Sequence, residues 1–162
     1  NIFRDGGDQE SAALQQLTYT TGSGGYTNST TPSIWPSKGV ITSPYGTRVD
    51  PVTGAASAFH EGVDLADDYG TPIVATAAGT VTFAGYTEGG YGNLVEIDHG
   101  NGFVTRYGHN SAVLVTPGMT VKQGQVIALM GSTGKSTGAH VHYEVRINGS
   151  AVDPMVFLPI SN

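Results

Sequence analysis

Residues 92–109 read GNLVEIDHGNGFVTRYGH, and their pattern indicates the fold class. On both sides of the segment HGNG at 99–102, β-branched, aromatic and other apolar residues alternate with polar ones. A period of two places the apolar side chains on one face of a strand, and a short connection rich in glycine and asparagine joins antiparallel strands. The stretch therefore predicts a β-hairpin that turns at 99–102.

The sequence on either side continues this pattern. GTPIVATAAGTVTFAGY (70–86) predicts two strands, and TVKQGQVIALMG (120–131) predicts another pair. No segment between residues 34 and 160 has a long helical stripe, so we expect an all-β, antiparallel fold. Segments 70–85 and 118–131 also resemble each other in the order of their glycines and β-branched residues. This echo indicates either an old duplication or two hairpins that obey the same turn rules.

Composition excludes several classes of protein. The 162 residues suffice for one domain with a core, and 24 glycines with only 12% charged residues indicate a turn-rich globular chain. The net charge of −6, with seven scattered Lys and Arg residues, argues against a nucleic-acid or anionic-membrane surface. Because cysteine is absent, disulfides and thiol chemistry are excluded.

The N-terminal part differs from the rest of the chain in its amino-acid composition. Residues 18–33, TYTTGSGGYTNSTTPS, have linker composition, whereas 8–17, DQESAALQQL, predicts one or two helical turns. We therefore expect a tail and linker over 1–33 and a single domain over 34–162. The chain begins with Asn rather than Met, which predicts a fragment or mature form with a membrane or coiled-coil anchor upstream. The tail either tethers the domain or folds back over it as a latency segment.

The segment GSTGKSTG at 131–138 resembles the end of a phosphate-binding loop. Such a loop needs a glycine five residues before Gly134, where this chain has Leu129, and it must lead into a helix. The residues that follow, AHVHYEVRI, alternate with period two and predict a strand instead. Nucleotide binding is therefore not expected here.

The same strand offers a start for a metal site. His140 and His142 are two residues apart, so they project from one face, and Val141, Tyr143 and Val145 project from the other. Neutral imidazole is a favoured zinc ligand. By itself, however, a His-x-His pair is more often incidental than a ligand pair.

A second segment strengthens the metal interpretation. FHEGVDLA (59–66) supplies His60 and Asp64, which share a face if the segment is extended, with Gly62 allowing close backbone approach. We expect strands of a single sheet to deliver all these ligands. A chain without thiolates favours an open, catalytic zinc site over a closed, structural one. His109 adds a further imidazole, whereas His99, within the turn at 99–102, is expected to be structural or solvent-facing.

The ordered set His60-x-x-x-Asp64, Tyr107-Gly-His109 and His140-x-His142 resembles the lysostaphin-type (LytM-type) zinc endopeptidases of bacterial cell walls. The resemblance extends from about Ile41 to Leu158. It implies that the zinc ligands are His60, Asp64 and His142 and that the catalytic pair is His109 and His140. The implied fold is a twisted antiparallel β-structure, the duplicated hybrid motif, whose large sheet forms the floor of a long groove.

The implied function is zinc-dependent hydrolysis of peptide cross-links of bacterial peptidoglycan, in the extracytoplasmic cell envelope. The alternative is a non-enzymatic binding or regulatory module of the envelope, since some members lose ligands; all five expected residues are present here. A groove tyrosine found in certain members is replaced by Gly54, which leaves Tyr45 and Tyr107 as candidates. Glycine bridges and meso-diaminopimelate cross-links both remain possible substrates, with loops 43–58 and 85–93 as specificity elements. The sequence assigns no substrate-binding residue and no oligomeric state.

Overall fold

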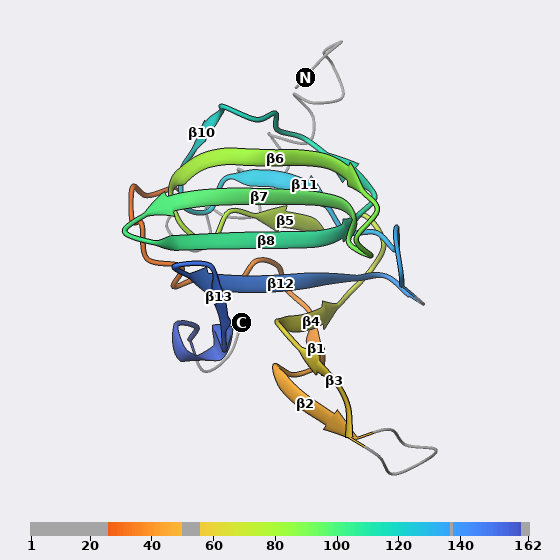
Figure 1. The fold of residues 1–162 in the computed structure, drawn as a ribbon. Helices are drawn as coiled ribbons and strands as arrows, with labels where there is room; N and C mark the ends of the chain where they lie inside the picture. The colour runs from red at the N-terminus through yellow and green to blue at the C-terminus, as the bar shows by residue number, and fades with distance from the viewer. Residues whose placement is uncertain (1–25, 50–55, 137, 160–162) are drawn as a thin grey trace.

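The computed structural model describes residues 26–49, 56–136 and 138–159 (Figure 1). The helix expected at 8–17 and most of the expected linker lie outside these residues. At the described end of the linker, Thr27 and Gln123 exchange backbone hydrogen bonds of 3.1 and 2.9 Å. Among the described residues, no helix is long and apolar enough to cross a membrane.

The described residues form thirteen strands and one short 3₁₀ helix, which confirms the all-β fold class. Every strand pairing is antiparallel. The strands are β1 (Val40–Ser43), β2 (Gly46–Val49), β3 (Ala56–His60), β4 (Val63–Ala66), β5 (Pro72–Val74), β6 (Gly79–Thr87), β7 (Gly92–Gly100), β8 (Phe103–Asn110), β9 (Ala112–Val113), β10 (Thr120–Val121), β11 (Val126–Leu129), β12 (His140–Ile147) and β13 (Ser150–Val152), and the 3₁₀ helix is Pro154–Val156.

The largest sheet has the order β1-β4-β12-β8-β7-β6-β10, and β13 pairs with β12. Its centre is the hairpin of β7 and β8, as the alternation in 92–109 predicts (Figure 1). The backbone at Gly100, Asn101 and Gly102 has φ of 82°, 53° and 83°. This left-handed conformation favours glycine and asparagine, so the residues of the turn and its backbone agree.

The other two predicted strand pairs form, but each is divided between two sheets. β6 and β10 belong to the large sheet, whereas β5 and β11 belong to a three-stranded sheet of order β5-β11-β9. β5 pairs with β11 and β6 pairs with β10. Each strand of segment 70–85 thus pairs with the opposite strand of segment 118–131, the reciprocal pairing expected of two related halves. This pairing supports the duplication interpretation of the sequence echo.

The core lies between the three-stranded sheet and the large sheet, which overlap in Figure 1. Val141, Tyr143 and Val145 of β12 are fully buried in it, as their alternation predicts. The opposite face of β12 therefore carries the histidines. At about 25 cal/mol per Å² of apolar surface removed from water, such side chains fix which face of the sheet points inward.

A chain of buried hydroxyl groups crosses this core. The Tyr143 hydroxyl lies 2.7 Å from Thr76 Oγ1, and Thr76 Oγ1 lies 3.0 Å from the Tyr107 hydroxyl. Thr105 Oγ1 lies 2.7 Å from both the Tyr107 hydroxyl and His99 Nε2. His99 Nδ1 is 2.8 Å from a backbone carbonyl oxygen, to which it donates. His99 is therefore structural rather than solvent-facing, and burial lowers its pKa below the ordinary value.

Candidate metal centre

Three strands bring His60, Asp64 and His142 together. His60 ends β3, Asp64 lies in β4, and His142 lies in β12. Asp64 and His142 face each other in the register of β4 and β12, so the pairing of two strands distant in sequence places them side by side. Residues 60, 64 and 142 form the one cluster of potential metal ligands found among the described residues.

The path of residues 59–66 differs from the single extended segment that the sequence predicts. The chain leaves β3 at His60 and enters β4 at Val63, so the two strands belong to different sheets. The expectation that one sheet delivers all the ligands is therefore wrong: His60 comes from the two-stranded sheet β2–β3. Gly62 permits this break, because a Cβ there would lie 2.2 Å from the carbonyl oxygen of Tyr143. Its close approach is to β12 rather than to a metal.

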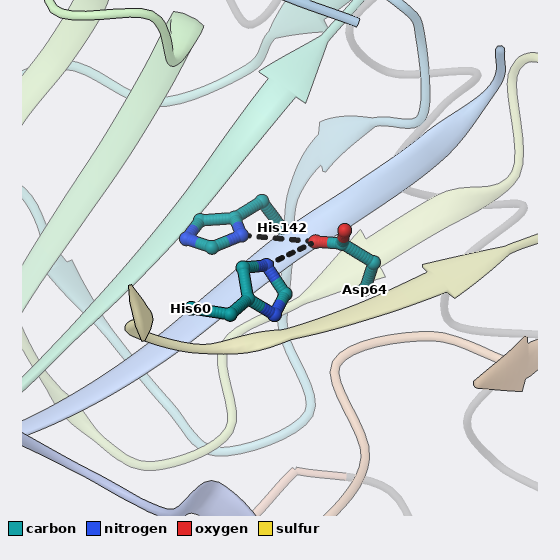
Figure 2. Close-up of side chains that lie close together, drawn as sticks. All are labelled: His60, Asp64 and His142. Carbon is teal, nitrogen blue, oxygen red and sulfur yellow. Dashed lines mark hydrogen bonds and ion pairs between the residues drawn. The ribbon is translucent and has the colours of Figure 1, made fainter. Parts of the chain in front are cut away.

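The geometry of the cluster suits a tetrahedral ion. Asp64 Oδ1 lies 2.9 Å from His142 Nδ1 and 3.4 Å from His60 Nε2 (Figure 2). One atom of each of the three side chains lies within 4.8 Å of the other two. Ligands about 2.0–2.1 Å from a tetrahedral zinc ion are themselves about 3.3 Å apart, so two imidazole nitrogens and one carboxylate oxygen at these distances fit zinc.

Hydrogen bonds on the far side of each ring orient the two histidines. His60 Nδ1 donates to the Pro44 carbonyl oxygen at 2.8 Å, and His142 Nε2 donates to Glu144 Oε2 at 2.8 Å. When such a ring carries a single proton, this donation places its lone pair on the nitrogen that faces Asp64. Metal-binding histidines are commonly held in this way by a carbonyl or carboxylate oxygen.

In the metal-free chain, the hydrogen bonds of His142 with Asp64 and Glu144 shift the pKa values of His142 and Glu144. Burial disfavours the charged form of His142, but hydrogen bonds to Asp64 and Glu144 outweigh burial and raise the pKa of His142 to about 9. Burial likewise opposes ionisation of Glu144, but His142, Tyr91 and Arg146 outweigh it and lower the pKa of Glu144 to about 2. A proton on His142 thus occupies the position that a cation would take.

Glu144 is a functional candidate that the motifs did not identify. Its side chain is only 2% exposed, and Oε2 accepts hydrogen bonds from His142 and from the Tyr91 hydroxyl at 2.7 Å. Oε1 accepts one from Arg146 Nε at 2.9 Å, and Arg146 NH2 also contacts Glu61 at 2.7 Å. The period-two alternation that pairs His140 with His142 also places residue 144 on their face, and this was the signal available in the sequence.

The other two expected residues, His109 and His140, lie beside the cluster. Their ring centroids are 4.6 Å apart, and His140 Nε2 lies 3.9 Å from Asp64 Oδ1. His109 Nδ1 donates to the Thr133 carbonyl oxygen at 2.7 Å, and His140 Nδ1 to the Gly138 carbonyl oxygen at 2.8 Å. In the neutral form of either ring, the lone pair therefore lies on Nε2. Burial lowers the pKa of His109, which keeps this imidazole neutral at pH 7.

The histidines lie in a groove of about 830 Å³. Residues of β4, β8 and β12 line it, together with loops 89–91 and 134–136, and β3 contributes Phe59 and His60. A smaller hollow of about 270 Å³ shares Asp64 and His140 with it.

Neither tyrosine proposed from the sequence lines this groove. Tyr107 is fully buried with its hydroxyl in the core, and the Tyr45 hydroxyl donates to the Ala151 carbonyl oxygen at 3.2 Å. Tyr91 lines the groove instead, from within the predicted specificity loop 85–93. Its hydroxyl group hydrogen-bonds Glu144.

Comparison with known proteins relates this chain to a family. The sequence model of peptidase family M23 matches residues 58–154. The chain is 49% identical over 120 residues to the DD-carboxypeptidase/endopeptidase Mpg of Neisseria meningitidis, which covers 74% of this chain and 27% of that protein. It is 39% identical over 125 residues to the murein hydrolase activator NlpD of Escherichia coli, covering 77% of this chain and 31% of that protein.

The fold agrees as well. The catalytic domain of the antimicrobial peptidase lysostaphin from Staphylococcus simulans superimposes with a TM-score of 0.65 at 34% identity, over 73% of this chain and 90% of that chain. This chain spans less than a third of either curated relative. The resemblance to the lysostaphin-type peptidases is confirmed, and the chain belongs to peptidase family M23.

Proposed function

We propose that the chain is a zinc-dependent endopeptidase that hydrolyses peptide cross-links of bacterial peptidoglycan, in the extracytoplasmic envelope. The observation that carries this proposal is the orientation of four histidines. His60, His109, His140 and His142 each donate from one ring nitrogen to a carbonyl or carboxylate oxygen, and in the singly protonated ring the lone pair then lies on the other nitrogen. Two of them join Asp64 in a set of three ligand atoms.

In the proposed mechanism, His60 Nε2, His142 Nδ1 and one oxygen of Asp64 hold the ion. When bound, zinc polarises a carbonyl group and lowers the pKa of water to about 7, which supplies a nucleophile at neutral pH. A three-residue ligand set also leaves a position open for the reacting groups.

The pair His109 and His140 moves the proton. Since Nδ1 of each ring is engaged by a carbonyl oxygen, the proton is taken up and returned at Nε2. During hydrolysis the carbonyl carbon gains the oxygen of water, the C–N bond breaks, and the leaving amine takes the proton. A neutral His109 at pH 7 suits the first of these transfers.

A second candidate function is a non-enzymatic envelope module that binds a wall peptide or a wall enzyme in the groove. The observation in its favour is the 39% identity to a protein named as a murein hydrolase activator. The presence of all five expected residues, in an arrangement that fits zinc and proton transfer, favours the enzyme.

Release of amine from purified cell walls separates the two functions. The enzyme is expected to release new amino termini, to stop when a chelator removes the metal, and to recover on addition of zinc. The matched control is Asp64→Ala, which removes one ligand and should be inactive at every zinc concentration. If the zinc-bound chain binds walls of both cross-link types and releases no amine, the endopeptidase is excluded and the binding module stands.

A further inference from the structure

Lys135 is the residue of the GSTGKSTG segment that neither nucleotide binding nor the proposed metal site explains. It lines the groove and its side chain is exposed. We propose that Lys135 binds a substrate carboxylate, and that the substrates are peptides with a free carboxylate on the carbon that bears the scissile nitrogen. This inference rests on the proposed function and specifies its substrate class.

The loop that carries Lys135 is fixed at the reacting centre. Two residues before Lys135, the Thr133 carbonyl oxygen accepts from His109 at 2.7 Å. One residue after it, Ser136 Oγ lies 3.2 Å from His140 Nδ1. Lys135 therefore lies between the contacts to the two histidines proposed to move the proton.

The same loop is held against the opposing loop, 89–92. The Lys135 amide donates to the Gly90 carbonyl oxygen at 3.0 Å. Gly134, with φ of 74°, packs so closely that an added Cβ would lie 2.3 Å from the Gly92 amide nitrogen. A positive charge on an anchored backbone loses less conformational freedom when it binds a carboxylate than one on a mobile loop.

The charges of the groove leave Lys135 without a partner. Three carboxylates line the groove, and each is engaged: Glu61 with Arg146, Glu144 with His142, and Asp64 with the histidine cluster. Lys135 is the one Lys or Arg residue lining the groove, and no carboxylate within the described part of the chain lies within ion-pair distance of it. An anionic group of the substrate could therefore form an ion pair with Lys135.

The smaller hollow, which shares Asp64 and His140 with the groove, differs from it in the charges of its lining. Apart from Asp64 and His140, it is lined by small, uncharged side chains, those of Thr42, Ala66, Gly138 and Ala139. Its volume of about 270 Å³ is about a third of that of the groove. Lys135 lines only the larger of the two spaces.

Two kinds of bond match this arrangement. In a meso-diaminopimelate cross-link, the scissile nitrogen is attached to a carbon with a free carboxylate, and alanine supplies the carbonyl group. A stem peptide that ends in alanyl-alanine has the same arrangement, because its terminal residue carries both the nitrogen and the carboxylate. A bond inside a glycine bridge has no such carboxylate, so Lys135 would disfavour glycine bridges as substrates.

The test compares two stem peptides that end in alanyl-alanine, one with a free C-terminal carboxylate and one with a C-terminal carboxamide. The zinc-bound chain, Lys135→Met and the matched control Lys122→Met are each assayed for release of the terminal residue. A charge-assisted hydrogen bond is typically worth about 1.5–3 kcal/mol, so Lys135→Met should lower kcat/KM for the acid about 10- to 150-fold, mainly through KM. The carboxamide should be hydrolysed equally by all three proteins.

A binding measurement separates this inference from the proposed function. Calorimetry of the metal-free chain should show tighter binding of the acid than of the carboxamide, and Lys135→Met should abolish the difference. Binding with this preference but no hydrolysis supports the carboxylate contact and overturns the proposed enzyme. Equal binding and equal hydrolysis of the two peptides, or an equal loss for both in Lys135→Met, overturns the role of Lys135.

Discussion

Replacing Glu144 with glutamine tests whether this buried carboxylate orients His142 at the candidate metal site. The substitution keeps the shape of the side chain but removes its charge and one acceptor oxygen. In the wild-type chain, the two oxygens accept from His142 and Tyr91 on one side and from Arg146 on the other, at 2.7–2.9 Å. A glutamine amide presents a donor to one of these sides, so one set of contacts must be lost.

The two orientations of the amide differ in cost. If the NH₂ group faces His142, the ring must accept at Nε2, and its proton moves to Nδ1, the atom that faces Asp64. If the NH₂ group faces Arg146, two hydrogen-bond donors, the NH₂ group and Arg146 Nε–H, face each other. Arg146 nevertheless keeps its contact with Glu61. We expect the second orientation, with a loss of about 10- to 100-fold in zinc affinity. The metal-free chain should lose about 1–3 kcal/mol in free energy of unfolding.

The effect of Glu144→Gln on zinc affinity depends on the pH at which the affinity is measured. In the wild-type chain the pKa of His142 is raised to about 9, so at pH 7 zinc must displace a proton. Without the Glu144 charge this pKa falls, and weaker proton competition masks part of the affinity loss at pH 7. Zinc affinity is therefore compared at pH 9, by competition with a chromophoric chelator.

Glu96→Gln is the matched control. It removes the same charge from a neighbouring carboxylate, which pairs with Arg106 at 2.7 Å but does not contact the cluster. Its zinc affinity should equal that of the wild type, and its stability loss should stay below about 1 kcal/mol. Unchanged zinc affinity in Glu144→Gln at pH 9 would refute the proposed role of Glu144 in orienting His142.

Four further outcomes are expected. His109→Ala and His140→Ala should each keep zinc, measured by metal analysis, and lose activity at least about 100-fold; loss of the metal would move that residue into the ligand set. Apparent zinc affinity should rise about tenfold per pH unit from pH 7 to 8, because the raised pKa of His142 makes zinc compete with a proton; a flat profile would contradict this. In the metal-free chain, the interactions of protonated His142 should make their full contribution to the free energy of unfolding below the unfolded pKa of about 6.5. This contribution should be lost as the pH rises through about 9. Thr76→Val should lower the free energy of unfolding by about 1–3 kcal/mol, because it removes the hydroxyl group that hydrogen-bonds the buried Tyr143 hydroxyl; denaturant unfolding with an unchanged midpoint would show that the hydroxyl chain contributes no net stability.

Much of the fold could be predicted from local patterns. The hairpin at 92–109 and the inward face of β12 follow from alternation and turn residues, which act over a few positions. The pairing of β5 with β11 and of β6 with β10 could not be predicted in the same way. Strands adjacent in sequence usually pair, but here burying the apolar faces of two sheets against each other separates them. The boundary between tail and domain at 33/34 stays a prediction.

For the candidate site, too, some features could be predicted from local sequence and others could not. Residue types and spacing, together with the family resemblance, made His60, Asp64, His109, His140 and His142 the candidates, because the chemistry of a ligand or base is a property of its side chain. Spacing also placed His140 and His142 on one face of a strand, since the period of a strand is local.

Only the tertiary structure decided how these residues meet. It delivers His60 from a separate sheet, fixes each ring by a hydrogen bond from its far nitrogen, and buries Glu144 behind His142. It also places Lys135 in the groove between contacts to His109 and His140. These features depend on contacts between residues distant in the chain, 78 positions apart for Asp64 and His142. Such contacts form only when the packing of whole strands selects a register, so no local pattern in the sequence specifies them.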